Sequence, residues 1–273
     1  MKTILVTGTN KGIGLEIVRQ YLNDGFKVIA TCRNLSKQDS LNELLNSFPN
    51  MISVYQMELL DEKSIESFSS KIKDIPIDIF INNAGVTFGY SRNAKLSNTG
   101  ISLNKLNAFG YIQTENWLPI FKANCIAPLL LAQLLYKNIM LGKEKKMIFI
   151  SSKPASITEN TGGSMYMSRS SRTALNQVIK SLSIDLAGEG ISVASISPGW
   201  VKTDSGGLNA LIDVNTSVTG IRNVIENLTI KNSGKFWDYN GEFIPSTKNI
   251  PSYDLTHSVP LNLYCIPVFR LVT

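Results

Sequence analysis

Short apolar runs alternate with longer segments of mixed polarity along most of the chain. Seven of these runs have the length and the β-branched or aliphatic character of strands, at residues 3–7, 27–32, 52–56, 77–81, 147–150, 191–196 and 235–239. Between the first two runs, apolar residues from Ile13 to Leu22 recur at helical spacing until Asn23-Asp24-Gly25 ends the pattern. Strands that alternate with helices predict an α/β fold, a doubly wound parallel sheet of about seven strands with helices on both faces.

The alternation continues without a visible break, which predicts a single domain over residues 1–273. No proline- or serine-rich linker and no internal repeat interrupts it. The least regular segment, residues 86–114, is either an insertion on the substrate side or a plain surface insertion. Residues 246–273 form an apolar, proline-containing tail, for which packing on a neighbouring subunit and covering the site both stay open.

Composition narrows the possible functions. At 273 residues with 43% hydrophobic residues, the chain can form a sizeable core. Its three cysteines, Cys32, Cys125 and Cys265, lie far apart without metal-ligand spacing, so we expect reduced, buried thiols. The single histidine, His257, excludes a His-ligated zinc centre and a Ser-His-Asp triad in the main body, and we predict no metal site.

Charge and hydropathy indicate a small-molecule enzyme of the cytoplasm. The formal net charge is +6, but basic residues are scattered, so we expect no nucleic-acid partner. No uninterrupted apolar run approaches the roughly 20 residues of a membrane span, and the first apolar run ends too early for a signal sequence. We therefore predict a cytoplasmic protein that does not enter a membrane.

A glycine-rich turn joins the first predicted strand to the first predicted helix. Glycine at these positions lets the backbone bend and approach phosphates, which the following helix N-terminus attracts. The turn predicts a Rossmann-type fold with a dinucleotide bound there. Its residues are Gly8, Thr9, Asn10, Lys11, Gly12, Ile13 and Gly14.

The charge after the second strand favours NADP(H) over NAD(H). An acidic residue there would bind the 2′-hydroxyl of NAD, whereas this chain has Thr31, Cys32 and Arg33. Arg33 can pair with a 2′-phosphate, and Lys11 can add a second positive charge. The other interpretation, that both are ordinary surface cations, stays open.

Four further motifs in the expected order resemble the short-chain dehydrogenase/reductase family over residues 1 to about 245. The motifs are Asn82-Asn83-Ala84-Gly85 after the fourth strand, Asn124 on the next long helix, Ser151-Ser152 after the fifth strand, and residues 198–203 after the sixth. Residues 30–34, 198–207 and 234–239 are most similar to the branch of C-factor and sniffer-type carbonyl reductases. The resemblance implies an oxidoreductase acting on a small carbonyl or alcohol substrate, assembled as a homodimer or homotetramer through helix faces.

The resemblance also implies cofactor contacts beyond the glycine turn. Glu58 and Leu59 take the place beside the adenine, where the family usually has aspartate. Asn83, Ala84 and Gly85 should line the cofactor, and Thr203 should reach the nicotinamide amide. The remaining contacts implied on that side are Pro198, Gly199 and Val201.

In one of the two registers that the resemblance allows, the family's catalytic tyrosine and lysine are replaced in this chain. Ser152 takes the place of the serine that holds the substrate carbonyl, and Asn124 that of the asparagine that anchors a relay water. Counting back from Ala174-Leu175-Asn176, and forward sixteen residues from Ser152, puts Ser168 in the tyrosine place and Arg172 in the lysine place. A competing register makes Tyr166 the proton donor, with Ser170 four residues later.

These replacements leave the chemistry open. Two residues turn a helix by about 200°, so within a helix Tyr166 would face away from the site of Ser168. Arg172 can still bind the cofactor's ribose hydroxyls, but an arginine is a poor proton shuttle. Acid–base catalysis typically contributes about 10² to 10⁴ in rate. We expect an NADP(H)-dependent oxidoreductase with an atypical site, with a cofactor-binding pseudoenzyme and a non-redox eliminase or isomerase as alternatives.

Overall fold

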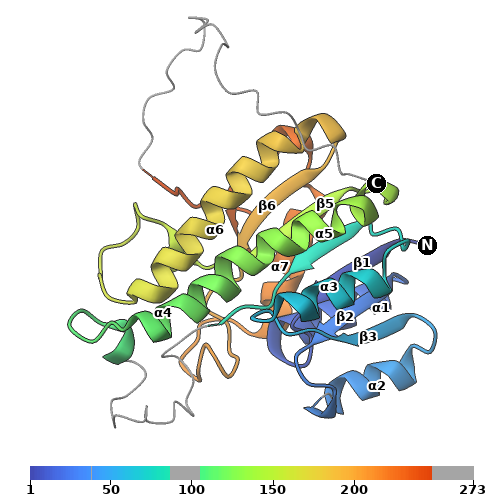
Figure 1. The fold of residues 1–273 in the computed structure, drawn as a ribbon, viewed down its shortest axis with the longest axis horizontal. Coiled ribbons are helices and arrows are strands. Elements are labelled where there is room, and N and C mark those ends of the chain that lie inside the picture. The colour runs from blue at the N-terminus through green and yellow to red at the C-terminus, as the bar shows by residue number, and fades with distance from the viewer. Residues whose placement is uncertain (38, 87–104, 248–273) are drawn as a thin grey trace, which may run out of the picture.

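The computed structural model describes residues 1–37, 39–86 and 105–247, which contain a parallel sheet in the strand order β3-β2-β1-β4-β5-β6-β7 (Figure 1). All six strand pairings are parallel, which confirms the predicted doubly wound sheet of seven strands. The strands are β1 (Thr3–Thr7), β2 (Lys27–Cys32), β3 (Ile52–Gln56), β4 (Ile79–Asn82), β5 (Lys146–Ile150), β6 (Ser192–Ser197) and β7 (Phe236–Asp238).

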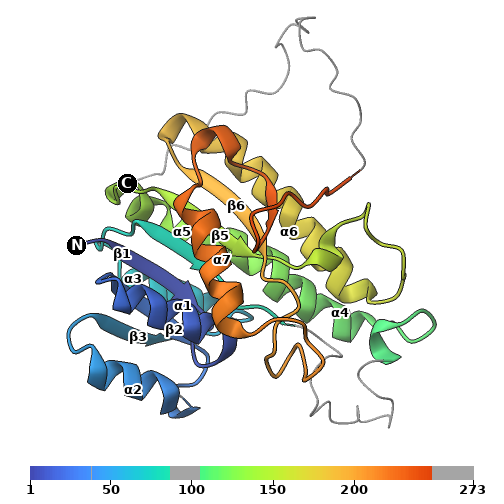
Figure 2. The same cartoon turned by 180° about the vertical axis from the view of Figure 1, so that it is seen from behind.

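Helices cover both faces of the sheet, as the alternating pattern predicted. In order, they are α1 (Gly12–Asn23), α2 (Asp39–Ser47), α3 (Glu62–Lys71), α4 (Thr114–Phe121), α5 (Ala127–Leu141), α6 (Tyr166–Asp185) and α7 (Val214–Glu226). Helices α1, α2 and α7 pack on one face (Figure 2), and α3, α5 and α6 pack on the other (Figure 1). Each face has its own apolar core, because alternate residues of a strand point to opposite sides.

The first strand shows how the pattern produces this arrangement. Residues 4–7 are all buried, with Ile4 and Val6 in the core under α1 and Leu5 in the core under α5. Strands buried on both faces read as continuous apolar runs, as this one does. The fourth strand begins later than the predicted residue 77, because the Ile77 N–H donates to the carbonyl of Asn138 at 3.0 Å instead of to a neighbouring strand.

Helices α4 and α5 form one continuous helical run, Thr114–Leu141, joined by a π-helical turn at Lys122–Ile126. This run has 28 residues and a mean hydropathy of 1.6 over its most apolar window, so by length and composition alone it could cross a membrane. Polar residues such as Asn124 and Gln133 break it into short apolar stretches, which is why the sequence prediction missed it. Half of that window is buried inside the fold, and a core helix passes the same test.

Two predicted segments fall largely outside the described residues. Most of the irregular segment 86–114 lies in residues 87–104, and nearly all of the tail 246–273 lies in residues 248–273. Cys265 and His257 belong to that tail, while Cys32 and Cys125 are buried, as expected, and form no disulfide within the described residues.

The topology points to one edge of the sheet as the site. Strand order reverses between β1 and β4, which are hydrogen-bonded neighbours although β2 and β3 lie between them in sequence. Ligands of open α/β sheets bind at the carboxyl ends of the strands at such a switch point. The glycine turn follows β1 and the Asn82–Gly85 motif follows β4, so both lie at that edge.

Candidate active site

The glycine turn after β1 has a conformation and a close packing that require glycine. Gly8 and Gly12 have φ of +70° and +59°. A Cβ on Gly14 would lie 2.2 Å from the carbonyl oxygen of Gly8 and 2.5 Å from Nδ2 of Asn83. The turn therefore brings backbone to the surface at the start of α1, as binding a pyrophosphate requires.

Asn83 fixes this turn to the end of β4. Its Nδ2 donates to the carbonyls of Thr7 at 2.9 Å and Gly8 at 3.0 Å. The Thr7 hydroxyl in turn accepts from the N–H groups of Asn83 and Ala84. A Cβ on Gly8 would lie 2.9 Å from Cα of Ala84. The two predicted cofactor segments thus form one connected surface, and Asn83 uses its side chain as well as its backbone.

The cations predicted to read a 2′-phosphate are exposed and have acidic neighbours. Arg33 is 81% exposed, with Nε 3.9 Å from Oε2 of Glu58, and Nζ of Lys11 lies 2.7 Å from Oδ2 of Asp204. Exposed ion pairs typically contribute about 0–1 kcal/mol, so a phosphate can displace either acid at little cost. Thr9 is buried, and its hydroxyl donates to the carbonyl of Thr31 at the end of β2.

Several other predicted cofactor residues have structural contacts. Leu59 packs in the core on the α3 side, and Ile13 packs against the opposite core. The Glu58 carboxylate accepts from the N–H of Leu60 at 3.2 Å. Asn10 lies in the turn and is half-buried.

The connection after β6 lies against the glycine turn. A Cβ on Gly12 would lie 3.4 Å from Cγ2 of Thr203, so these two predicted contacts face each other. A hollow of about 260 Å³ opens beside them, lined by Lys202, Thr203, Asp204, Gly207 and Leu208. Three contacts hold this connection in place. The carbonyl of Pro198 accepts a hydrogen bond from the Ser217 hydroxyl, and Gly199 lies close to the ring of Tyr239. Val201 and Ile212 form an isolated β-bridge.

Asn124 ties the π-helical turn to the chain after β4. Its Oδ1 accepts from the N–H of Val86 at 2.8 Å, and its Nδ2 donates to the Val86 carbonyl at 2.9 Å and to Oγ of Ser171 at 3.1 Å. The side chain is 1% exposed. π-helical turns frequently occur at functional sites, and this one turns Asn124 toward α6.

Ser168 and Arg172 lie one turn apart on α6 and face the sheet edge. The Ser168 hydroxyl accepts from Nδ2 of Asn107 at 3.2 Å and is 7% exposed as a residue. Nη1 of Arg172 donates to the carbonyl of Ile150 at 2.5 Å, at the end of β5. Ser152 follows two residues later, and its hydroxyl has no hydrogen-bond partner among residues 1–37, 39–86 and 105–247.

Arg172 packs directly over the Asn82–Gly85 motif. A Cβ on Gly85 would lie 2.5 Å from Nη2 of Arg172 and 3.0 Å from Oδ1 of Asn124. Burial lowers the pKa of Arg172 to about 10, so the guanidinium remains charged at neutral pH. No carboxylate in the described part of the chain pairs with it. The site thus contains hydroxyl groups, an amide and one unbalanced positive charge.

The residues of the competing register lie elsewhere on α6. Tyr166 is the first residue of the helix, is 41% exposed, and has its ring 6.4 Å from that of Phe109. The Ser170 hydroxyl accepts from Nε1 of Trp117 on α4 at 3.1 Å. This geometry favours the register in which Ser168 and Arg172 face the site.

Two residues of the site were missed by the sequence reasoning. Asn107 accepts from the N–H of Met167 at 2.8 Å while it donates to Ser168, and Ser171 bonds Asn124. Asn107 lies in a segment without any periodic pattern, so the sequence carried no signal for it. Ser171 was accessible to inference, because it lies three residues after Ser168 on the same helix.

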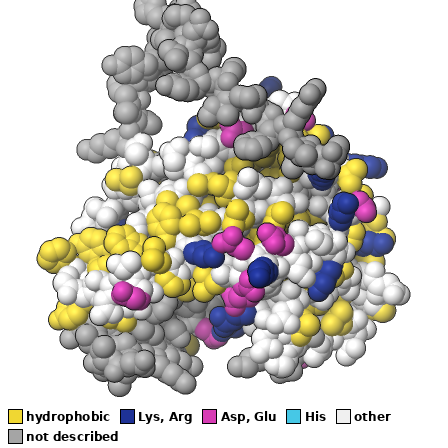
Figure 3. Space-filling view, viewed as in Figure 1, with side chains coloured by type: hydrophobic (Ala, Val, Ile, Leu, Met, Phe, Trp, Pro, Cys, Tyr) yellow, Lys and Arg dark blue, Asp and Glu magenta, His cyan; other side chains and the backbone are white. Residues whose placement is uncertain are grey.

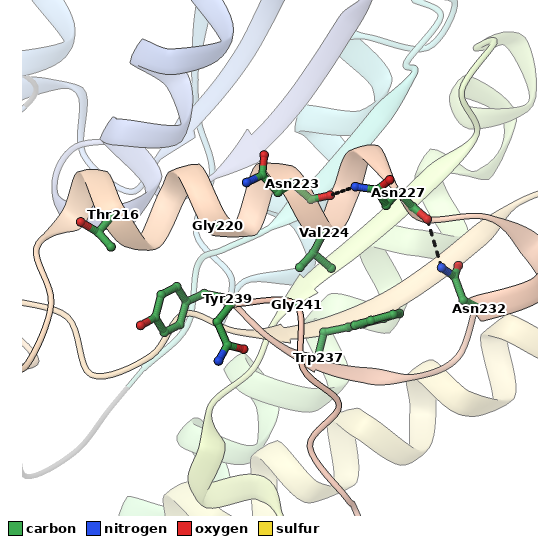
Figure 4. A pocket seen from close by; sticks show the side chains of 10 residues that line it. Thr216, Gly220, Asn223, Val224, Asn227, Asn232, Trp237, Tyr239 and Gly241 are labelled. Atoms are coloured by element: carbon green, nitrogen blue, oxygen red, sulfur yellow. Dashed lines mark hydrogen bonds between the residues drawn. The ribbon is translucent and has the colours of Figure 1, made fainter.

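The larger hollow, of about 370 Å³, lies at the outer edge of the sheet between α7 and β7 (Figure 4). Its lining includes the rings of Trp237 and Tyr239 and the side chain of Asn223. None of the predicted site residues lines it.

Known proteins resemble the chain over most of its length. Residues 2–209 match the short chain dehydrogenase family. The C-signal protein of Myxococcus xanthus is 30% identical over 181 residues, which cover 66% of this chain and 99% of that protein. The carbonyl reductase Sniffer of D. melanogaster is 30% identical, has a TM-score of 0.75, and is covered over 99% of its length by 90% of this chain.

An NADPH-bound carbonyl reductase from chicken fatty liver gives a similar match. It is 29% identical with a TM-score of 0.76, and the alignment covers 90% of this chain and 99% of that one. The match in sequence, in sheet topology and in the position of the glycine turn leads to one conclusion. The chain belongs to the short-chain dehydrogenase family.

Proposed function

We propose that this protein is an NADP(H)-binding oxidoreductase that acts on a small carbonyl or alcohol substrate through an atypical site. The observation that carries the proposal is the surface formed by the glycine turn and the Asn82–Gly85 motif, where side chains on Gly8, Gly14 or Gly85 would collide with neighbouring atoms. This surface ends at the guanidinium of Arg172. Glycine turns at the carboxyl end of a first parallel strand are a common place for a dinucleotide pyrophosphate, which supports the proposal.

The preference for NADP(H) is supported by charge. Arg33 and Lys11 are the cations predicted to contact the 2′-phosphate, and each is exposed and lies beside one acid, Glu58 or Asp204. The carbonyl reductase from chicken fatty liver is named as NADPH-bound, which supports the same choice. A charge-assisted hydrogen bond to a bound phosphate contributes about 1.5–3 kcal/mol, more than the exposed ion pair that it would replace, so one such bond would favour the phosphorylated cofactor by roughly 10- to 150-fold.

The residues near the carboxyl ends of β4 and β5, which come from the chain after β5, the π-helical turn and α6, have separate roles in the proposed reaction. The bound cofactor supplies the hydride. Ser152, whose hydroxyl has no partner within the described residues, would hold the substrate carbonyl, and Arg172 would bind the ribose hydroxyls. Asn124 positions Val86 and Ser171. Ser168 does not approach the acidity of a phenol, so the proton comes from solvent, and we expect slow turnover.

A second candidate is a cofactor-binding protein without catalytic activity. This candidate is supported by Ser168, which stands where the family's proton-donating phenol is expected. Its hydroxyl is nearly buried, accepts a hydrogen bond from Asn107 and does not approach the acidity of a phenol, so it cannot replace the phenol as an acid. Turnover separates the two candidates, since both bind the cofactor.

Two measurements test the proposal. Fluorescence titration should give a Kd for NADPH at least tenfold lower than for NADH. With NADPH bound, a panel of ketones and aldehydes should give slow loss of the nicotinamide absorbance that depends on the carbonyl compound. Tight binding without oxidation would favour the second candidate, and absence of NADPH binding would refute both.

We further propose a cytoplasmic homodimer of a single-domain chain that docks through the outer face of α4 and α5. Apolar side chains gather along these helices (Figure 3). Leu118, Ile126, Leu134 and Leu141 are 63%, 45%, 41% and 56% exposed. All four side chains are thus exposed along the helical run, from its first helix to its end.

The face is self-complementary about Ile126. Leu118 and Leu134 lie eight residues before and after it, and Glu115 and Lys137 lie eleven residues before and after it. In an antiparallel pairing of two copies with Ile126 on the twofold axis, Leu118 of each copy would lie beside Leu134 of the other. Glu115 of each copy would likewise lie beside Lys137 of the other. The change Ile126→Lys should convert the dimer to a monomer in sedimentation velocity, whereas Leu35→Lys, at an exposed leucine elsewhere, should not. A dimer that survives Ile126→Lys would reject this face.

A further inference from the structure

The guanidinium of Arg172 has no acid beside it within the described residues, at the point where the proposed function puts substrate and cofactor. Its one hydrogen bond goes to the Ile150 carbonyl, and no acid in the described residues pairs with it. The sequence from 86 to 114, which connects β4 to α4, contains three basic residues and no aspartate or glutamate. A partly buried cation without an anion is costly, so a bound anion would stabilise it.

Most of the donors of this guanidinium are free. An arginine has five N–H groups, and one of them is used by Ile150. Nε and Nη2 make no hydrogen bond within the described residues and are not enclosed. The same group can therefore bind a ribose hydroxyl and still present a second edge to another ligand. Carboxylates fit such an edge, because their two oxygens match two adjacent N–H groups.

Ser152, whose hydroxyl has no hydrogen-bond partner within the described residues, follows closely after the residue that anchors this charge. Arg172 is anchored at the carbonyl of Ile150, two residues before Ser152. An extended chain rises about 3.3 Å per residue, so the backbone positions of Ile150 and Ser152 are about 7 Å apart. A molecule whose carbonyl is held by Ser152 can reach the guanidinium only with a group a few bonds away. This limits the distance between the reacting carbonyl and the anion.

We propose that the substrate carries a carboxylate one to three bonds from its reacting carbonyl, as in short-chain oxo acids, and that Arg172 binds that carboxylate. The inference rests on the proposed function and specifies its substrate class. In the reaction, hydride from the reduced nicotinamide forms a C–H bond at the carbonyl carbon, and a proton from solvent reaches the oxygen. The products are a hydroxy acid and the oxidised cofactor.

The test compares acids with their neutral esters on the full-length protein. Two pairs are used, benzoylformate with methyl benzoylformate and acetoacetate with methyl acetoacetate, which place the carboxylate at two distances. Binding to the complex with oxidised cofactor is measured by calorimetry, so the result does not depend on turnover. KM is measured with NADPH for every compound that reacts.

Two variants on α6 separate a specific contact from general charge. Arg172→Gln removes the proposed contact. Arg169→Gln removes the same charge three residues earlier, where the guanidinium donates to the backbone carbonyls of Pro154, Gly163 and Ser164. The parent should bind at least one acid tenfold or more tighter than its ester. The ratio should fall to near one in Arg172→Gln and stay unchanged in Arg169→Gln, with melting temperatures checked for both.

Three results would overturn the inference. The first is equal binding of acid and ester by the parent, which includes no binding of either. The second is a preference for the acid that survives in Arg172→Gln, and the third is a preference for the acid that is lost equally in Arg169→Gln. NADPH binding measured in parallel distinguishes this failure from a failure of the proposed function. If NADPH binds and neutral ketones are reduced without any advantage for acids, only the substrate class is wrong.

Discussion

Restoring a phenol and an amine at the positions of Ser168 and Arg172 should raise carbonyl reduction strongly. Acid–base catalysis contributes about 10² to 10⁴ in rate, which corresponds to roughly 3–5.5 kcal/mol in the barrier. Both side chains point to the sheet edge, since Ser168 meets Asn107 and Arg172 meets Ile150. The double variant Ser168→Tyr with Arg172→Lys should therefore reduce a neutral ketone at least 100-fold faster than the parent.

Space at position 168 sets the conditions of this experiment. Ser168 is 7% exposed and its hydroxyl lies 3.2 Å from Nδ2 of Asn107, so a phenol has to displace that amide. A triple variant with Asn107→Ala makes room, but it leaves the buried N–H of Met167 unpaired, at about 1–3 kcal/mol of stability. We expect the triple variant to be less stable than the double variant and at least as active.

The assay is the loss of nicotinamide absorbance at saturating NADPH, with the Kd for NADPH measured for each variant. Tyr166→Phe serves as the control, because the ring of Tyr166 lies against Phe109 and its loss of a hydroxyl should leave the parent's rate unchanged. If variants that fold and bind NADPH are no faster than the parent, the assignment of positions 168 and 172 is wrong. A 100-fold loss in Tyr166→Phe would instead make that tyrosine the proton donor.

Other predictions follow from single contacts. Gly85→Ala should weaken NADPH binding and destabilise the fold by about 1–3 kcal/mol, measured by denaturant titration, because the new Cβ would collide with Arg172. In the control Gly188→Ala the new Cβ would lie in open space among the described residues, so the stability should change by no more than about 0.5 kcal/mol. Arg33→Asp should raise the Kd for NADPH at least tenfold and leave that for NADH unchanged or lower, and equal effects on both would refute a phosphate contact. Burial raises the pKa of the Cys32 and Cys125 thiols, so at pH 8 mass spectrometry should find them unlabelled by iodoacetamide until the protein is denatured.

The doubly wound parallel sheet was accessible from the sequence because its five inner strands, β1, β2, β4, β5 and β6, are buried on both faces. Runs such as residues 3–7 and 27–32 have no polar interruption until the strand ends, so the pattern fixes their position to the residue. Strand ends set by distant contacts were less accessible. Ile77 continues the apolar run of β4, but its N–H pairs with Asn138 across the fold.

Within the site, the sequence predicted those features that depend only on the spacing of residues in one helix or one turn. Ser168 and Arg172 share a helix face, and the glycine turn follows from three residues in fixed order. Partners from irregular chain could not be predicted, because Asn107 meets Ser168 only through the folded path of the connection. The acidic neighbours of Lys11 and Arg33 were missed for the same reason, since Asp204 is 193 residues from Lys11.

Asparagine amides hold both ends of the segment between β4 and α4. At one end Asn124 forms hydrogen bonds with the N–H and the carbonyl of Val86. At the other end Asn107 accepts a hydrogen bond from the N–H of Met167 in the first turn of α6. The intervening residues can therefore change in length and sequence while their two points of attachment stay in place. An architecture of this kind permits grafting, in which a segment exchanged from a relative at residues 87–104 would leave the contacts of Asn107 and Asn124 intact.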